Sequence, residues 1–153
     1  VGSGTVQEFT EWIQYVNFGG TSPMSILRVE NGREKPWNVK YWGVGNEAWG
    51  CGGNMRPEYY ANIYRQYATF MTSWSNTERL FRIASGANGN DYHWTEVLMR
   101  DIPHNMMEGV ALHHYSVIDW GKKGSATAFS EQEYFTTMKR ALFMDELITK
   151  HTT

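Results

Sequence analysis

The sequence predicts an α/β fold in which three parallel strands alternate with amphipathic helices. Three short apolar runs, over residues 38–46, 80–87 and 109–114, have the length of buried strands, and helical patterns precede, separate and follow them. Each run ends in glycine-rich, polar or aromatic-polar residues. Strands that alternate with helices form parallel sheets with right-handed crossovers. All three polar ends should therefore meet at one edge of the sheet.

The composition is that of a folded domain. The chain has 153 residues, of which 41% are hydrophobic and 20% charged, which suits one domain with a core and not a disordered segment. A net charge of −2 provides no basic face for phosphates, so no nucleic-acid partner is expected. No apolar run reaches membrane-spanning length, so no membrane partner is expected either. The aromatic content of 15% favours a core of large side chains or a pocket where rings stack on a sugar or base.

The N-terminal part predicts one helix and a long surface segment. Thr5-x-x-Glu8 is a capping box that opens a predicted helix over 5–17. Its apolar face comprises Phe9, Trp12, Ile13 and Val16. Glycines and prolines interrupt residues 18–36, which are expected to hold no regular element. Segments of that length are usually functional or inserted.

Three further helices are expected. Pro57 suits a first helical turn, and an apolar stripe extends that helix to about residue 74, before a polar turn over 75–79. A short helix over 92–101 follows the second strand. After a loop over 119–129, the capping box Ser130-x-x-Glu133 predicts one helix to about residue 150.

Three strands cannot close a barrel of eight. The chain is therefore either a small open α/β domain or a consecutive part of a (β/α)8 barrel. Val1 is not an initiator methionine, and Thr153 directly follows a helical pattern, which favours the second reading. Residues 1–153 are thus expected to be a fragment of a single (β/α)8-barrel domain.

Glu47 is the first candidate for catalysis. It follows the first strand at the end where α/β proteins place their chemistry. Glycoside cleavage requires one carboxyl group that protonates the leaving oxygen and a second that acts as nucleophile or base. Walls formed by Trp42 and Trp49 would raise the pKa of Glu47 by desolvation, and Asn46 could donate to a sugar hydroxyl. The alternative is a structural ion pair of Glu47 with a Lys or Arg at the sheet edge.

A nucleotide site is the weaker reading of the same segment. Gly43-Val44-Gly45-Asn46-Glu47-Ala48 matches the dinucleotide pattern G-x-G-x-x-G/A. The glycine-dense loop after it cannot propagate the required helix. No Asp or Glu lies between Glu58 and Glu78, where the ribose-binding acid is expected. No cofactor is therefore expected.

Cys51 is the single cysteine, which rules out an intrachain disulfide and a zinc site built on cysteines. It remains a minor candidate for a nucleophile, because no histidine partner is evident from the sequence. His113 and Tyr115 at the end of the third strand share one face, and His114 points to the other. Neither His-x-His nor His-Glu-x-x-His occurs, so no metal site is expected.

The chain resembles the α-L-arabinofuranosidases of glycoside hydrolase family 51 over nearly its whole length. The most specific motif is Tyr41-Trp42-Gly43-Val44-Gly45-Asn46-Glu47-x-Trp49-Gly50-Cys51-Gly52-Gly53-Asn54-Met55-x-Pro57-Glu58-Tyr59-Tyr60. Further matching segments are Gly2-Ser3-Gly4-Thr5-Val6, Glu11-Trp12, Ala84-Ser85-Gly86-Ala87-Asn88, Leu112-His113-His114-Tyr115, Lys123-Gly124-Ser125-Ala126-Thr127 and Met144-Asp145-Glu146-Leu147-Ile148. An Asn-Glu pair alone would be less specific, since it marks a whole clan of barrel hydrolases.

The resemblance implies a (β/α)8 barrel of which this chain supplies roughly the fourth to sixth strands, and a retaining mechanism. It implies that Glu47 is the acid/base and that Asn46 contacts the sugar 2-hydroxyl. Tyr115 would hydrogen-bond near the nucleophile, and His113 would support the same end of the site. Trp49 and Cys51 would border the cleft. The nucleophile would be a Glu on the seventh strand, beyond Thr153. Asp145-Glu146 is excluded as its equivalent because that pair lies in a helical pattern.

The implied activity is release of terminal α-L-arabinofuranosyl residues from arabinan- or arabinoxylan-type saccharides, with the fragment alone inactive. Two alternatives stay open: another retaining glycosidase of the clan, such as an endo-glucanase or xylan-acting enzyme, and a non-catalytic carbohydrate-binding fragment. A cytoplasmic location is expected, because no signal peptide is visible and cysteine is rare. The resemblance leaves homo-oligomerisation of the full-length protein open.

Overall fold

A parallel three-stranded sheet forms the centre of the computed structural model, which describes residues 3–153. The strands pair in chain order and are β1 (Tyr41–Val44), β2 (Phe81–Asn88) and β3 (Gly109–His113). The helices are α1 (Val6–Asn17), α2 (Pro23–Glu30), α3 (Pro57–Phe70), α4 (Tyr92–Asp101), the 3₁₀ helix η1 (His104–Met106), α5 (Glu131–Arg140) and α6 (Phe143–Thr152). The predicted α/β class with parallel strands is confirmed.

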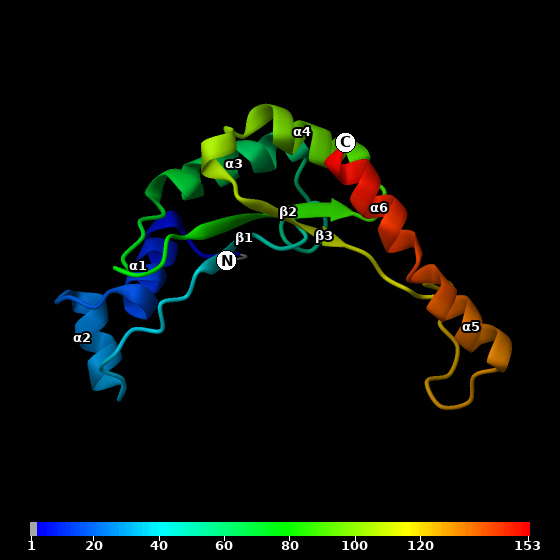
Figure 1. Cartoon of the computed structure of the whole chain (residues 1–153), viewed down its shortest axis with the longest axis horizontal. Helices are drawn as coiled ribbons and strands as arrows, with labels where there is room; N and C mark the ends of the chain where they lie inside the picture. Colours follow the sequence, from blue (N-terminus) through cyan, green and yellow to red (C-terminus); the bar gives the residue numbers. More distant parts are fainter. Residues whose placement is uncertain (1–2) are drawn as a thin grey trace.

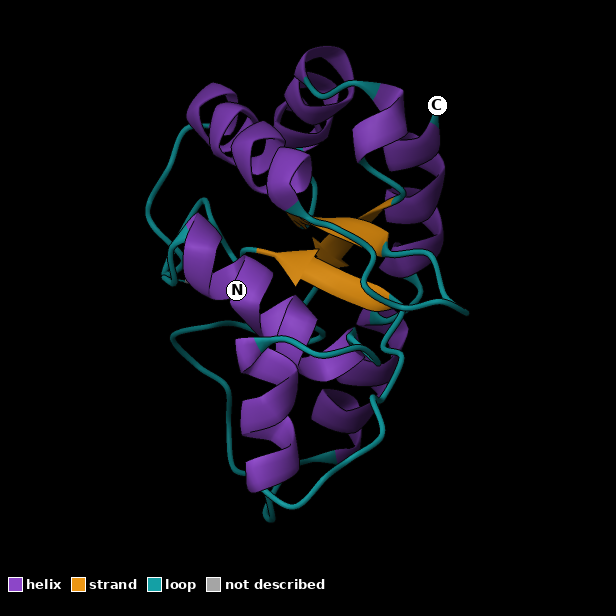
Figure 2. Ribbon diagram, turned by 90° about the vertical axis from the view of Figure 1, so that its left-hand side faces the viewer, coloured by secondary structure: helices purple, strands orange, loops and turns teal. Residues whose placement is uncertain are grey.

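Helices α3 and α4 lie along one face of the sheet (Figure 1). Helices α1 and α2 lie toward one end of the strands and α5 lies beyond the other, so the molecule is arched. The strands fan out beneath the upper helices in Figure 2, with the twist usual for sheets. In Figure 1 no described helix covers the face of the sheet that lies away from α3 and α4.

Helix α1 begins as the sequence predicts. The Thr5 hydroxyl accepts a hydrogen bond from Glu8 N at 3.2 Å, and the Glu8 carboxylate accepts one from Thr5 N at 2.6 Å. These two bonds satisfy donors that the first helical turn would leave unpaired. The buried Phe9 and Ile13 join the core, where the Phe9 ring lies 5.9 Å from that of Trp42.

Helix α2 corrects the expectation that residues 18–36 hold no regular element. Ser22 is the N-cap and forms a capping box with Ser25, and Pro23 occupies the first helical position. Both residue types favour helix starts, because serine accepts from an unpaired N–H and proline lacks one. Arg28 on this helix is 1% exposed. A buried arginine explains why the segment is ordered despite its glycines.

The first strand is shorter than the predicted range of 38–46. Asn38 has a positive φ of 55°, which is incompatible with a strand. Residue Val39 is held instead by the buried Asn17 side chain, whose oxygen accepts from Val39 N at 2.7 Å and whose nitrogen donates to Val39 O at 2.8 Å. The end of α1 therefore fixes the entry to β1.

Two helix ends also differ from the prediction. Helix α3 ends at Phe70, not near residue 74, because Met71 adopts an extended conformation. The Trp74 ring then packs against Phe18, at a centroid distance of 5.0 Å. The single helix predicted from residue 130 to 150 is two helices, since Ala141 and Leu142 form a tighter turn with i to i−3 hydrogen bonds.

A tyrosine hydroxyl joins β1 and β2 where their pairing ends. The last paired residues are Val44 and Ala84. Beyond them the Tyr60 hydroxyl donates to Val44 O at 2.5 Å and accepts from Ser85 N at 2.6 Å. Burial raises the pKa of Tyr60, so the hydroxyl remains protonated and able to donate. Helix α3 thus sets the separation of the two strand ends that lead into the candidate site.

Replacing Tyr60 with phenylalanine is expected to lower the free energy of unfolding by about 1–3 kcal/mol, because Val44 O and Ser85 N would be left buried without their partner. Urea unfolding followed by tryptophan fluorescence measures the loss. Tyr59→Phe is the matched control, since this neighbouring tyrosine is exposed. Equal midpoints for the two variants would contradict a bridging role for the Tyr60 hydroxyl.

The pairing of β2 with β3 contains an irregularity between Ser85 and Asn88. A Cβ atom at Gly86 would lie 2.3 Å from Ala111 O, so only glycine allows this approach. The irregularity shifts the register just before the ends of both strands. It brings Asn88 opposite His113.

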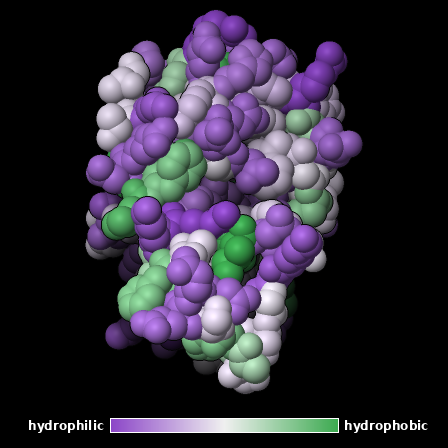
Figure 3. Space-filling model, turned by 90° about the vertical axis from the view of Figure 1, so that its right-hand side faces the viewer, coloured by the Kyte–Doolittle hydropathy of each residue, from purple (hydrophilic) through white to green (hydrophobic). Residues whose placement is uncertain are grey.

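Helix α5 buries no side chain within the described part of the chain. Its exposed apolar residues, continued by the turn after it, are Tyr134, Phe135, Met138 and Leu142. Figure 3 views this end of the molecule and shows hydrophobic side chains among hydrophilic ones. Such an amphipathic helix normally covers apolar surface of a neighbouring element.

Candidate active site

Glu47 lies just after β1 in a tight turn. Gly45 and Glu47 both have positive φ values, of 86° and 46°. The Glu47 carbonyl accepts hydrogen bonds from Gly50 N at 2.8 Å and Gly52 N at 2.9 Å. A Cβ atom at Gly52 would lie 1.8 Å from Asn46 O, so the turn closes only with glycine there. A left-handed conformation at a glutamate is uncommon and often marks a functional position.

Three side chains bond the Glu47 carboxylate. The Tyr115 hydroxyl donates to Oε1 at 3.1 Å, and His113 Nδ1 lies 3.0 Å from the same oxygen. The Cys51 thiol donates to Oε2 at 3.0 Å. His114 points elsewhere, with its Nε2 atom 3.2 Å from Arg140 O. The ends of β1 and β3 therefore meet at Glu47, with His113 and Tyr115 on one side of the strand.

The pKa of Glu47 lies below its ordinary value, contrary to the expectation that aromatic walls raise it. The hydrogen bond from Cys51 is the largest cause, followed by that from Tyr115, and the weaker opposing effect is desolvation. His113 lowers the pKa further. The donors stabilise the charged carboxylate. Desolvation opposes them less strongly, since 18% of the Glu47 side chain is still exposed.

Of the two tryptophans expected to wall Glu47, Trp42 lies in the core and Trp49 lies against His113. Trp42 is buried in the core, with its ring 5.2 Å from Trp12. Trp49 donates from Nε1 to Gly86 O at 2.9 Å and lies edge-on to His113 at 6.1 Å. Trp49 thus packs against the histidine that bonds the carboxylate. Asn46 is exposed at the same strand end and free of the core.

The alternative roles of Glu47 and Cys51 lose support. Within residues 3–153, the basic side chain within 4.0 Å of Glu47 is His113, and no lysine or arginine lies within that distance. The hydrogen bond to Glu47 raises the pKa of Cys51, followed by desolvation. A protonated thiol is a poor nucleophile.

Two residues that sequence reasoning did not select also contribute. Ser85 Oγ accepts from Ala48 N at 3.1 Å and so holds the start of the turn after Glu47. The Trp120 ring lies 4.9 Å from that of Tyr115, and Lys123 lies over it at 4.4 Å. Ser85 belongs to a motif noted in the sequence. Trp120 had no signal beyond being aromatic in a loop that follows a strand.

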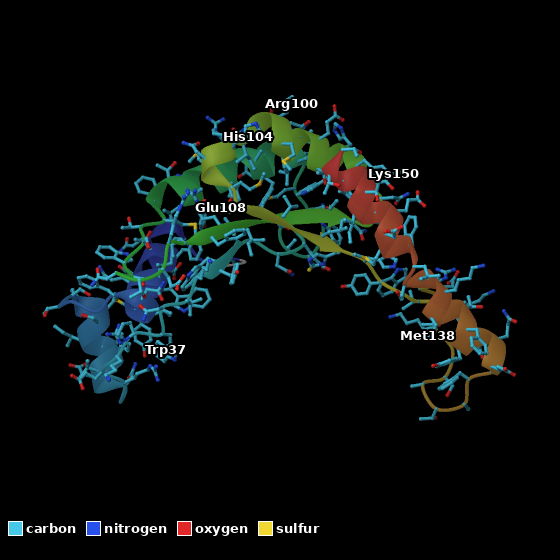
Figure 4. All side chains as sticks on the ribbon, viewed as in Figure 1. Trp37, Arg100, His104, Glu108, Met138 and Lys150 are labelled. Atoms are coloured by element: carbon cyan, nitrogen blue, oxygen red, sulfur yellow. The ribbon has the colours of Figure 1, made fainter. Side chains whose placement is uncertain are left out.

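An ion-pair cluster of one carboxylate and two arginines lies near the start of β3, away from the end that carries His113, and its role is structural. Glu108, labelled in Figure 4, accepts from Arg82 at 2.7 Å and from Arg79 at 3.1 Å. The Arg82 guanidinium holds the pKa of Glu108 below its usual value. Asp145 and Glu146 occupy the first turn of α6, in agreement with the helical pattern that excluded them as a nucleophile.

Within residues 3–153, His, Cys, Asp and Glu side chains form no cluster of three or more suited to a metal ion. None of the described helices combines the length and the apolar character needed to cross a membrane.

Comparisons with known proteins agree on one family. Residues 3–134 match the sequence model described as the α-L-arabinofuranosidase 1 domain. The chain is 52% identical over 154 residues to an intracellular exo-α-L-arabinofuranosidase of Bacteroides ovatus, with 100% of this chain and 30% of the relative covered. A probable α-L-arabinofuranosidase C of Aspergillus flavus is 51% identical over 49 residues, which are 32% of this chain and 10% of the relative.

Solved structures give the same result. The family 51 arabinofuranosidase of Xanthomonas axonopodis pv. citri matches with a TM-score of 0.90 and 43% identity, over 99% of this chain and 30% of that one. The α-L-arabinofuranosidase of Thermotoga maritima in its arabinose complex has a TM-score of 0.67 and 26% identity, over 99% of this chain and 30% of that one. The three strands and their helices are thus part of a larger barrel fold, as predicted.

Proposed function

The chain belongs to the α-L-arabinofuranosidases of glycoside hydrolase family 51, and from this premise we propose that it carries the acid/base half of a retaining active site. The chain spans about 30% of the length of the Bacteroides ovatus relative. We place residues 1–153 within a single catalytic barrel domain, as roughly its fourth to sixth strands. The reaction is release of terminal α-L-arabinofuranosyl residues from arabinan- or arabinoxylan-type saccharides.

The observation that carries this proposal is the environment of Glu47. Two strand ends converge on one carboxyl group, whose two oxygens are bonded by His113, Tyr115 and Cys51. A side chain held at both oxygens has a fixed direction, which proton transfer to a bound substrate requires. Asn46 is exposed beside it for a sugar hydroxyl, and Trp49 borders the same edge.

The proposed reaction has two steps. In the first, protonated Glu47 gives its proton to the glycosidic oxygen, while a second carboxylate attacks the anomeric carbon and the leaving group departs. In the second, the Glu47 carboxylate takes a proton from water, which attacks the same carbon and releases arabinose. The three donors favour the charged form used in the second step. A nearby negative nucleophile would oppose them and favour the proton needed in the first.

We place that nucleophile on a later barrel strand, outside residues 1–153. The 153-residue chain alone is then inactive. The name of the Bacteroides ovatus relative, an intracellular exo-acting enzyme, supports a cytoplasmic location and action on terminal residues.

A chimera tests the proposal. The matching segment of the Bacteroides ovatus relative is replaced by this chain, and aryl α-L-arabinofuranoside, β-xyloside and β-glucoside are compared as substrates. Turnover is expected with the arabinofuranoside alone, and none is expected from the isolated chain with any of the three. The parent enzyme and the thermal midpoint of the chimera control for misfolding.

Other outcomes favour the alternatives. Cleavage of internal bonds in glucan or xylan would favour another retaining glycosidase of the clan. Binding of arabino-oligosaccharides without cleavage, unchanged by Glu47→Gln, would favour a carbohydrate-binding fragment. Clear turnover by the isolated chain that is lost in Glu47→Ala would contradict the placement of the nucleophile.

A further inference from the structure

We propose that Cys51 is a positioning residue for the acid/base, whose protonated thiol holds the Glu47 carboxylate in place. This inference rests on the proposed role of Glu47 and adds a function for the thiol beyond bordering the cleft. The Sγ atom lies 3.0 Å from Oε2, on the oxygen that His113 and Tyr115 do not occupy. Without the thiol, the carboxyl group would be held at Oε1 only.

The turn is built to present this thiol. Glu47 and Cys51 are four residues apart, and the backbone of the turn closes on the carbonyl of Glu47 itself through Gly50 N and Gly52 N. Asn54 N donates to Gly50 O at 2.7 Å, which fixes the far side of the loop. The Glu47 carbonyl therefore accepts two main-chain hydrogen bonds from the loop, and the Glu47 carboxylate accepts the hydrogen bond of the thiol from the same loop.

The space at Gly52 supports the same conclusion. A Cβ atom there would lie 1.8 Å from the backbone oxygen of Asn46, which no side-chain movement relieves. A larger residue would push the loop away from the strand end and carry the neighbouring Cys51 with it. The glycine that follows the cysteine thus allows the approach of the thiol to the carboxylate.

The groups facing the Glu47 carboxyl are Cys51 from its own loop, and His113 and Tyr115 from the end of β3. The hydrogen bond to Glu47 also raises the pKa of the Cys51 thiol. The coupling is reciprocal: the thiol favours the charged carboxylate, and the carboxylate favours the protonated thiol. The pKa of each group therefore changes when the other group is replaced.

Kinetics of the chimera test the effect on Glu47. In Cys51→Ala the acid/base loses a donor, so its pKa rises and the alkaline limb of the kcat/KM profile should move to higher pH. Loosened positioning should also lower kcat/KM about tenfold for aryl arabinofuranosides with poor leaving groups. Cys51→Ser keeps an O–H donor and should restore both properties in part. An unchanged pH profile in Cys51→Ala would overturn the proposal.

Alkylation provides a test that does not depend on activity. Iodoacetamide forms an S–C bond with the Cys51 thiolate and releases iodide, and mass spectrometry of the Cys51 peptide gives the rate against pH. In Glu47→Gln the midpoint of that rate profile should move to lower pH, because the carboxylate no longer favours the thiol. An unmoved midpoint would overturn the coupling, whereas an inactive chimera with a moved midpoint would overturn only the proposed function.

Discussion

Replacing Glu47 with alanine in the chimera is expected to lower kcat/KM by about 10²–10⁴-fold for arabinofuranosides with poor leaving groups, the range typical of a lost general acid. Such leaving groups need a proton as the glycosidic bond breaks, and Glu47 supplies it in the proposed mechanism. For a dinitrophenyl leaving group, which departs without a proton, the first step should be nearly unaffected. The measurement is the dependence of kcat/KM on leaving-group pKa.

The second step provides an independent check of the same variant. Without its base, the enzyme should accumulate the covalent intermediate, and added azide should restore turnover as a small nucleophile that needs no deprotonation. Glu58→Ala is a suitable control, because this carboxylate is half exposed and its ion-pair contact in the described chain is a long one, 4.0 Å to His93 Nε2. A loss that is equal for all leaving groups and not restored by azide would contradict the acid/base role.

The position of this carboxylate could be predicted from the sequence, and its electrostatics could not. An apolar run that ends in Asn46-Glu47 is a local pattern, and a strand end is where catalytic groups are expected. His113 and Tyr115 reach the same carboxylate from 66 and 68 residues further along. Their contact depends on which strands are neighbours and on the irregularity in β2, neither of which has a local signature.

The pKa of Glu47 is lowered and not raised as expected, and the geometry of β1 explains part of the difference. Trp42 and Val44 alternate with exposed residues along β1, so both side chains point toward the helices and into the core. Trp42 is near Glu47 in sequence, yet its ring packs against Phe9 and Trp12 in the core. The donor that matters most, Cys51, depends on a loop with four residues at positive φ between Gly45 and Asn54, which composition alone does not specify.

Helix α2 was missed although local signals for it exist. Ser22 followed by Pro23 is a favourable helix start, although glycines lie on both sides of the segment. What orders the segment is a tertiary feature: the buried Arg28 guanidinium donates to four main-chain carbonyl oxygens. These belong to Tyr15 at 2.8 Å, Phe18 at 2.9 Å, Glu34 at 2.9 Å and Arg33 at 3.3 Å.

The Arg28 guanidinium serves as a cap for α1. The carbonyls of Tyr15 and Phe18 lie at the C-terminal end of that helix, where oxygens lack intrahelical partners and the helix dipole favours a positive charge. The other two carbonyls belong to the chain after α2. The Arg28 side chain therefore joins the end of α1 to the chain after α2. Asn17, at the same end of α1, holds the entry to β1.

Replacing Arg28 with methionine is expected to lower the free energy of unfolding by about 3–5 kcal/mol, because four partly buried carbonyls lose a charged donor while the apolar volume is largely kept. Urea unfolding of the protein measures the change. The stability of Arg28→Lys should fall between that of the unmodified protein and that of Arg28→Met, since an ammonium group retains the charge but cannot span four acceptors in a plane. Arg79→Met, at a side chain that is 79% exposed in its ion pair with Glu108, should change stability by less than about 1 kcal/mol. Equal unfolding midpoints for Arg28→Met and Arg79→Met would mean that water replaces the guanidinium, and that α2 is held by its apolar contacts alone.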